Sequence, residues 1–166
     1  MAFTIRDMRP EDLQAVGRLA GRLVRLHHDY DPRRWMMPDG IEAGYARYFA
    51  SQLGQPETVL VVATHGSEIV AYAYAAVEER NWAELRDRCG RLHDLFVVES
   101  ARRQGLGRAM LRECICRLSA LEVRLIVTTT AWQNEPSQAL VRSLGFRPTV
   151  VELAKDLDPR ASESRL

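Results

Sequence analysis

The sequence predicts a single α/β domain in which helices flank a central, mixed but mostly antiparallel sheet. The stretch from Arg91 to Leu121 predicts one strand, one tight loop and one helix, because a β-branched and aromatic run is followed by apolar residues at helical spacing. Two further apolar runs, 58–64 and 68–77, are separated by only three residues and must form an antiparallel hairpin.

Elsewhere in the chain, apolar runs alternate with helical patterns. In order, we expect a strand at 3–6, a helix from 10 to about 27, a helix at 41–53, strands at 58–64, 68–77 and 92–98, a helix at 107–121, a strand at 124–130, a helix at 136–144 and a last strand at 146–153. The 166 residues suffice for one core and are few for two. We therefore expect one domain over 1–155 and a loose tail over 156–166.

The composition argues against several classes of function. The 23 basic and 22 acidic residues leave a net charge of +1, whereas binding to a phosphate backbone needs a basic face, so we expect no nucleic acid partner. No apolar run reaches the ~20 residues of a membrane span, and we expect a cytoplasmic protein with no membrane partner. Cys89, Cys114 and Cys116 lack metal-site spacing and are predicted to be reduced structural thiols, with no metal bound.

The loop Arg102-Arg103-Gln104-Gly105-Leu106-Gly107 stands between the predicted strand and helix. Glycine lets a ligand approach the backbone, and the first N–H groups of a helix attract anions. Together with the arginines, the loop is suited to a phosphate or pyrophosphate. The spacing fits neither GxGxxG nor GxxxxGK[ST], so taken alone the loop is equally compatible with a tight turn bearing solvated arginines.

Two motifs together resemble those of the GCN5-related N-acetyltransferase (GNAT) superfamily. Arg102, Gly105 and Gly107 match the pattern [RQ]xxGx[GA], and TTTAWQNEPSQALVRSLGF resembles the second signature through Asn134, Ser137, Leu140, Gly145 and Phe146. The resemblance implies the GNAT fold, with two splayed strands that hold acetyl-CoA. It also implies the coenzyme contacts: backbone groups of Leu95, Phe96 and Val97 for the pantetheine arm, Asn134, and the loop residues Arg102, Arg103, Gln104, Gly105, Leu106, Gly107 and Arg108 for the pyrophosphate.

His93 and Asp94 lie on the predicted central strand. Strict alternation would put His93 on one face with Leu95 and Asp94 on the other with Phe96. The family commonly has its base on the face of position 93, and a histidine pKa of about 6.5 suits that role. Asp94 matches an acid found in small-amine acetyltransferases and would attract a cationic amine. Either side chain is also compatible with a purely structural role.

The acid that would protonate the departing thiolate is missing from its usual place. The family commonly has a tyrosine seven residues after Asn134, and this chain has Val141 there. Ser137, Tyr72 or Tyr74 could replace it. Alternatively the thiolate leaves unaided, since thiol pKa values lie near 8.5, or catalysis is lost.

We therefore expect an enzyme that transfers an acetyl group from acetyl-CoA to a primary amine of a small or amino-acid-like molecule. The alternatives are a protein N-terminal or lysine acetyltransferase and a non-catalytic module that binds acyl-CoA. Loop 29–40 is predicted to be a substrate lid or a loop packed through Trp35, with a metal at His27 and His28 less favoured. Loop 78–90 is predicted to include a helical turn and to reach the site through Trp82. A homodimer is expected by analogy with the family.

Overall fold

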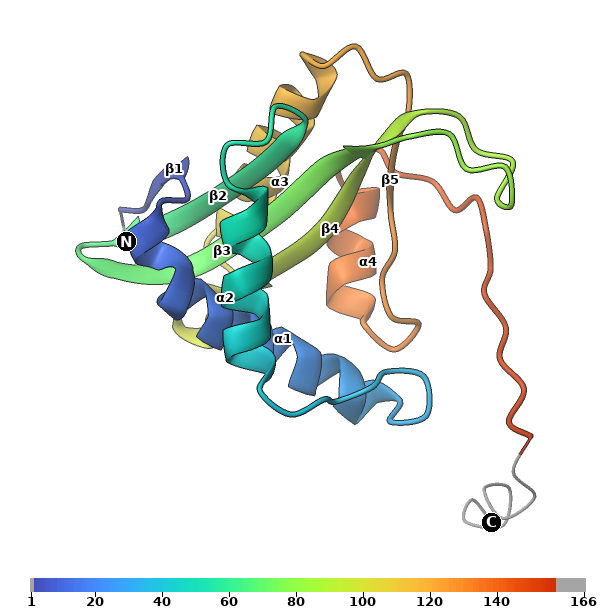
Figure 1. The fold of residues 1–166 in the computed structure, drawn as a ribbon, viewed down its shortest axis with the longest axis horizontal. Helices are drawn as coiled ribbons and strands as arrows, with labels where there is room; N and C mark the ends of the chain where they lie inside the picture. Colours follow the sequence, from blue (N-terminus) through green and yellow to red (C-terminus); the bar gives the residue numbers. More distant parts are fainter. Residues whose placement is uncertain (1, 158–166) are drawn as a thin grey trace.

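The computed structural model describes residues 2–157. Its centre is a five-stranded sheet in the order β1-β2-β3-β4-β5 (Figure 1). The strands are β1 (Thr4–Asp7), β2 (Thr58–His65), β3 (Glu68–Glu78), β4 (Cys89–Val97) and β5 (Ile126–Thr128). Neighbouring strands are antiparallel except β4 and β5, which are parallel. The predicted fold class is confirmed.

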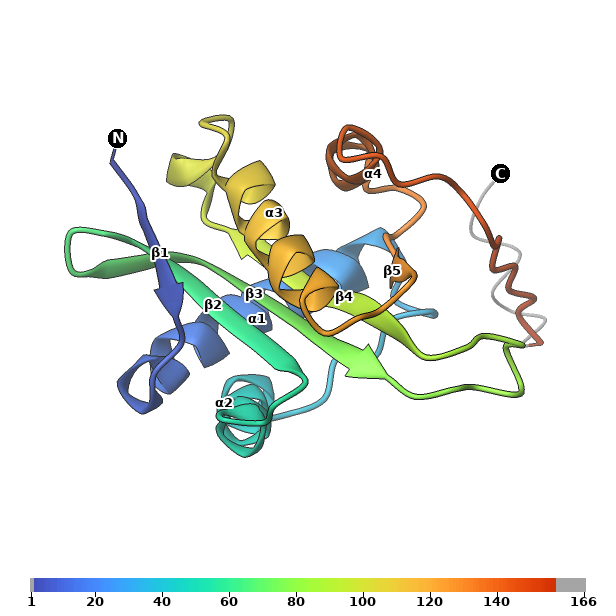
Figure 2. The same cartoon turned by 90° about the horizontal axis from the view of Figure 1, so that it is seen from above.

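Helices cover both faces of this sheet, as Figure 2 shows from above. The helices α1 (Leu13–Tyr30), which follows the short turn η1 (Pro10–Asp12), and α2 (Ile41–Gln52) lie on one face. On the other face lie α3 (Leu106–Ser119), preceded by η2 (Glu99–Ala101), and α4 (Glu135–Arg142). The core fills both faces of the sheet, where buried side chains of β2, β3 and β4 pack against α1, α2 and α3.

Helices α1 and α2 approach each other at backbone distance. A Cβ atom at Gly17 would lie 2.5 Å from the carbonyl oxygen of Glu42, and one at Gly21 would lie 2.8 Å from the Glu42 side chain. Since real Cβ atoms do not come so close to a carbonyl oxygen, glycine at position 17 is what permits this separation. Helix α2 is thereby fixed over β3.

Three expectations about local structure are wrong. Helix α1 continues to Tyr30 instead of ending near His27, since the pattern after Leu26 is polar and gave no sign of continuation. Residues 79–88 form no helical turn but an arm in which Asn81 and Arg86 pair as an antiparallel bridge. The predicted last strand, 146–153, pairs with no other strand in the described part of the chain and runs alone beside the molecule (Figure 1).

Most of the predicted tail, 158–166, lies outside the described residues. Within residues 2–157, no helix is both long and apolar enough to cross a membrane.

Candidate active site

The two parallel strands separate early. Their pairing covers only Gly90 to Leu92 of β4 against Ile126 to Thr128 of β5, and the Thr128 hydroxyl closes it by donating to the carbonyl of Leu92 at 3.1 Å. From His93 to Val97, no described strand pairs with β4 on this side, and the two strands diverge in Figure 1. The predicted splayed strand pair is therefore present, and it leaves one edge of β4 free.

The register between β4 and β3 determines which backbone N–H and C=O groups of β4 point to this free edge. The N–H of Val98 donates to Val70 of the neighbouring chain segment, and alternate residues of a strand point their polar groups to opposite sides. Leu95 and Val97 therefore turn their N–H and C=O groups away from β3, whereas those of Phe96 point toward it. The carbonyl of Val97 accepts a hydrogen bond from Arg102 Nε at 2.9 Å.

The glycine loop adjoins this edge at the start of α3. Gly105 precedes the helix with φ of 79°, a left-handed conformation that only glycine adopts without strain, and Arg103 also has a positive φ of 63°. Leu106 is buried and anchors the loop, while 102–105 are exposed. The first N–H groups of α3 have no preceding helical carbonyl to bind. The loop thus presents backbone donors and arginines to solvent.

Gly107 has a different role from Gly105. A Cβ atom there would meet Leu140 of α4 at 3.4 Å and Leu95 at 3.6 Å. Both are ordinary contact distances, so position 107 lies where α3, α4 and β4 meet and has room for a single methyl group. Arg108 donates to the Ser143 hydroxyl at 2.9 Å and joins the same two helices.

A β-bulge interrupts β4 at the predicted catalytic pair. Tyr74 pairs with Asp94 and Ala75 with Leu92, which leaves His93 as the extra residue. A bulge adds one residue to the strand, so the alternation of side chains between the two faces is interrupted at that point. His93 and Asp94 therefore both face α2, and the expected strict alternation, with the two residues on opposite faces, is wrong.

Asp94 lies among tyrosines. The Tyr72 hydroxyl donates to its carboxylate at 3.2 Å, and the Asp94 charge also acts on Tyr45 of α2 and on Tyr74. Removal from water raises the pKa of Asp94 to about 6, against the Tyr72 hydrogen bond, which lowers it. No ion pair of this carboxylate occurs among residues 2–157. Asp94 is thus a partly buried carboxylate that is ionised at neutral pH.

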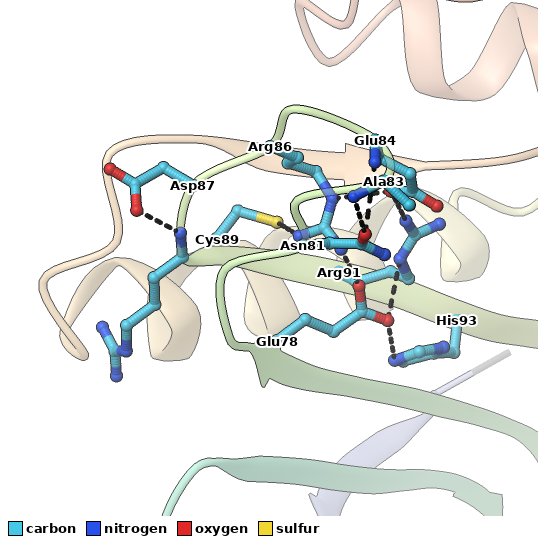
Figure 3. Close-up of polar contacts among 10 residues, drawn as sticks. Glu78, Asn81, Ala83, Glu84, Arg86, Asp87, Cys89, Arg91 and His93 are labelled. Atoms are coloured by element: carbon cyan, nitrogen blue, oxygen red, sulfur yellow. Dashed lines mark hydrogen bonds and ion pairs between the residues drawn. The ribbon is translucent and has the colours of Figure 1, made fainter.

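His93 stacks on Tyr74, with ring centroids 4.7 Å apart, and its Nε2 lies 3.6 Å from the Glu78 carboxylate. Glu78 also holds Arg86 and Arg91 at the base of the arm (Figure 3). Burial lowers the pKa of His93, with Arg91 acting in the same direction and Glu78 opposing it. The imidazole is therefore neutral at pH 7 and able to accept a proton.

Helix α2 completes this face. The Tyr48 and Tyr74 hydroxyls are hydrogen-bonded at 2.8 Å, and burial followed by this bond raises the pKa of Tyr74. We call Tyr45, Tyr48, Tyr72 and Tyr74 the tyrosine wall. An open hollow of about 440 Å³ adjoins it, lined by Tyr48, Tyr74, Glu78 and His93 and by the α2–β2 connection.

The chain matches the model of the acetyltransferase (GNAT) family over residues 21–146. It belongs to that family. Among curated proteins, none matches it.

Solved structures of low sequence identity share the fold. A mutant of the BH1408 protein from Bacillus halodurans is 21% identical with a TM-score of 0.78, over 93% of this chain and 99% of that one. A predicted acetyltransferase from Clostridium acetobutylicum, solved with acetyl-CoA, is 18% identical with a TM-score of 0.72, over 94% and 97%. An aminoglycoside 6'-N-acetyltransferase from Acinetobacter haemolyticus is 20% identical with a TM-score of 0.66, over 93% and 99%.

In this GNAT protein, the second signature forms helix α4. Asn134 caps the helix, its side chain accepting from the Ser137 N–H at 3.2 Å. Val141, in the place of the family's usual tyrosine, is partly buried and packs against the core. The Tyr72 and Tyr74 hydroxyls are bonded to Asp94 and Tyr48, and burial raises the pKa of both, which makes each a weaker acid.

The two predicted loops differ in how they are held. Trp35 stacks on His27 at 4.6 Å, and its carbonyl oxygen lies 2.9 Å from His28 Nδ1, so loop 31–40 is folded against the end of α1. Trp82, on the arm, is exposed and lies under Arg80. Among residues 2–157, no cluster of three His, Cys, Asp or Glu side chains is arranged to hold a metal. Cys89 and Cys114 are buried and Cys116 is exposed.

Sequence reasoning missed the contribution of α2 to the site. The sequence predicts a helix around Tyr45 and Tyr48, but nothing in their spacing shows which strand they meet. Glu78 was also missed. It lies at an even-numbered position of the same strand as Tyr72 and Tyr74, so the alternation of side chains could have predicted that all three point to one face.

Proposed function

We propose that this GNAT protein transfers the acetyl group of acetyl-CoA to a small primary amine that is cationic in solution. The observation that supports this most is the bulge in β4. It brings the neutral imidazole of His93 and the ionised carboxylate of Asp94 to one face of the sheet, just after the pairing between β4 and β5 ends. A base and an anionic group side by side are what an ammonium acceptor needs.

The coenzyme lies, in this proposal, along the free edge of β4. Leu95 offers its N–H and C=O groups and Val97 its N–H to the pantetheine arm as an added strand would, while the Val97 carbonyl accepts from Arg102. The amides that follow Arg103, with Arg102 and Arg108, bind the pyrophosphate at the start of α3. Arg102 already overlies Phe96 at 5.7 Å and is thus positioned beside the edge and the loop together.

The acceptor binds against the tyrosine wall. Asp94 attracts the ammonium, and His93 accepts its proton, because an imidazole with a lowered pKa is unprotonated at neutral pH. The free amine attacks the thioester carbon, so a C–N bond forms, the C–S bond breaks, and the nitrogen releases its second proton to water as the amide forms. The coenzyme thiolate leaves without a tyrosine at position 141, which a thiol pKa of about 8.5 allows.

The direct test is release of free CoA from acetyl-CoA with a panel of amines that includes polyamines, amino sugars, amino acids and peptides. We expect turnover with a small cationic amine, and loss of turnover in His93→Ala with acetyl-CoA affinity retained. Turnover with peptides alone would replace the small acceptor by a protein N-terminus or lysine. Acetyl-CoA binding without turnover on any amine would favour the non-catalytic module that Val141 suggests.

A further inference from the structure

Glu78, the last residue of β3, contacts three basic side chains at once. Its Oε1 lies 2.9 Å from Arg91 Nε and 3.6 Å from His93 Nε2, and its Oε2 lies 2.6 Å from Arg86 Nη2. Figure 3 shows the carboxylate joined to the arm on one side and to the imidazole on the other. One acidic side chain thus connects the arm 79–88 to the proposed base.

Two arginines fix the position of this carboxylate. The side chains of Arg86 and Arg91 are only 12% and 19% exposed, so their attraction to Glu78 is screened less than that of a surface pair. Arg86 is itself held, since its Nε donates to Glu84 at 3.0 Å and its Nη1 lies 2.6 Å from Cys89 Sγ. The place of Glu78 is therefore set by a network that does not involve His93.

The oxygen that faces His93 can still accept a hydrogen bond. Arg91 Nε, although 2.9 Å from this Oε1, is buried and makes no hydrogen bond within residues 2–157, so its N–H is not directed at the oxygen. The His93 contact at 3.6 Å is longer than the ~2.7–3.2 Å of an ordinary N–H···O bond. Hydrogen bonds of catalytic groups often reach that length only when the substrate is bound. Glu78 Oε1 is thus an open acceptor beside the imidazole.

The second nitrogen of His93 is free to take a proton. The ring is stacked on Tyr74 at an interplanar angle of 14°, and Nδ1 makes no hydrogen bond in the described part of the chain. In a neutral imidazole one nitrogen carries the hydrogen and the other the lone pair, and the hydrogen bond of the first decides which is which. An Nε2–H directed at Glu78 leaves the lone pair on Nδ1.

The imidazole has charged or titratable neighbours on three elements: Tyr74 and Glu78 of β3, Arg91 and Asp94 of β4, and Tyr48 of α2. Burial has the largest effect and lowers the pKa of His93, Glu78 opposes it, and Arg91 acts with burial. Glu78 therefore favours the protonated ring, which is the form that a base adopts during the reaction.

We propose that Glu78 is the positioning residue of His93: its carboxylate binds Nε2–H, directs the Nδ1 lone pair to the acceptor and stabilises the imidazolium that forms. This inference rests on the proposed function, in which His93 is the base. The ammonium proton moves to Nδ1, Nε2 keeps its hydrogen, and Glu78 gains no proton. The imidazolium then returns the extra proton to water in the open hollow.

Glu78→Gln removes the charge at nearly constant size, and we expect kcat/KM to fall ~10- to 100-fold, the loss typical when the partner of a metal-bound histidine is removed. The fall should lie in kcat, with KM for the amine and the Kd of acetyl-CoA unchanged. Glu84→Gln is the matched control, because Glu84 lies 3.0 Å from Arg86 and 3.7 Å from Arg91 but does not contact His93. Unchanged kcat/KM in a folded Glu78→Gln protein would overturn the proposal.

Glu78→Asp is a second variant that keeps the charge beside the two arginines but withdraws the carboxylate from His93 by one methylene group. We expect kcat to fall at least ~10-fold here also. Circular dichroism should show the wild-type fold for all variants. Full activity in Glu78→Asp would mean that the charge suffices and that the contact with Nε2 has no role.

A double-mutant cycle shows whether Glu78 acts through His93. In a His93→Ala background, Glu78→Gln should cost nothing further, because the group that it positions is gone. A further ~10-fold loss there would mean that Glu78 acts on the substrate or takes the proton itself, and would refute the inference.

Titration of the His93 ring by NMR gives a readout that does not depend on activity. The pKa of His93 should be lower in Glu78→Gln than in the wild type and should change less in Glu84→Gln. Equal values in the wild type and Glu78→Gln would exclude the contact. A wild type without turnover on any amine would overturn the proposed function and this role with it. Activity that is lost in His93→Ala but intact in Glu78→Gln would overturn the role of Glu78 alone.

Discussion

The glycine loop and the tyrosine wall lie on either side of β4 and are built from different parts of the chain. The loop depends on backbone conformation: Gly105 with φ of 79° and unpaired N–H groups at the start of α3. The wall depends on side chains from α2, β3 and β4 that meet only in the folded protein. A site made of backbone is therefore sensitive to one residue, whereas a site made of side chains can lose one member and keep part of its function.

The largest effect is expected from Gly105→Val. A β-branched residue is strained at positive φ, so the loop should lose the conformation that presents its N–H groups, and acetyl-CoA affinity should fall at least ~100-fold by calorimetry. Gly66→Val is the matched control, because Gly66 has a similar φ of 59° in the β2–β3 turn, far from the loop. Unchanged affinity in a folded Gly105→Val protein would contradict the assignment of the coenzyme loop.

His93→Ala should lower kcat/KM by ~10²-fold, a typical loss for a general base. In the wild type, kcat/KM should decline as pH falls through about 6, where Asp94 becomes protonated, and protonation of His93, whose pKa burial lowers, should deepen the decline at lower pH. Without His93, the decline should follow Asp94 alone, near pH 6. His65→Ala, an exposed histidine at the far end of β2, serves as control. If both kcat/KM and the pH profile stay unchanged, His93 has only a structural role.

Asp94→Asn should raise KM for the amine about tenfold and also stabilise the protein at neutral pH. The folded-state pKa of Asp94, about 6, exceeds its ordinary 3.8, so the folded protein binds this proton more tightly and gains stability as pH falls from about 7 to 4. Asparagine carries no charge to bury, and the free energy of unfolding should rise on the order of 2 kcal/mol at pH 8, with less gain at pH 5.

Urea unfolding at the two pH values measures this gain. Asp87→Asn is the control, and it should lower the free energy of unfolding at pH 8 instead of raising it. The backbone N–H of Arg88 and then Arg80 lower the pKa of this exposed carboxylate, so its charged form is favoured in the folded protein. A destabilised Asp94→Asn protein at pH 8 would mean that the Tyr72 hydrogen bond outweighs the burial of charge.

The smallest effect is expected from Val141→Tyr. If the thiolate leaves unaided, a tyrosine should supply a proton donor and raise kcat by up to ~10-fold, provided that chemistry limits turnover. Single-turnover rates of the wild type, Val141→Tyr and Ser137→Ala separate the possibilities. A slower Ser137→Ala protein would assign the proton to Ser137 instead, and a Val141→Tyr protein that binds coenzyme yet reacts no faster would exclude unaided departure as the limiting step.

Sequence alone predicted the parts of the structure that local pattern determines. The hairpin, the long helices and the glycine loop are all specified by neighbouring residues, and each is present. The bulge at His93 was missed because it arises from the register between β3 and β4, which involves residues about 20 positions apart. The strand expected at 146–153 has the right local composition, but a strand needs a partner, and local composition does not supply one.

The close contact of α1 with α2 offers a route to altered acceptor selectivity. Gly17 sets the distance between the two helices, and α2 carries Tyr45 and Tyr48 into the site. Any side chain at position 17 must push the two helices apart, and we expect this to move Tyr48 relative to Tyr74 although position 17 lies outside the tyrosine wall. Selection for a bulkier amine therefore has a target buried between α1 and α2, and mutations there would alter preference while every residue in the site stays the same.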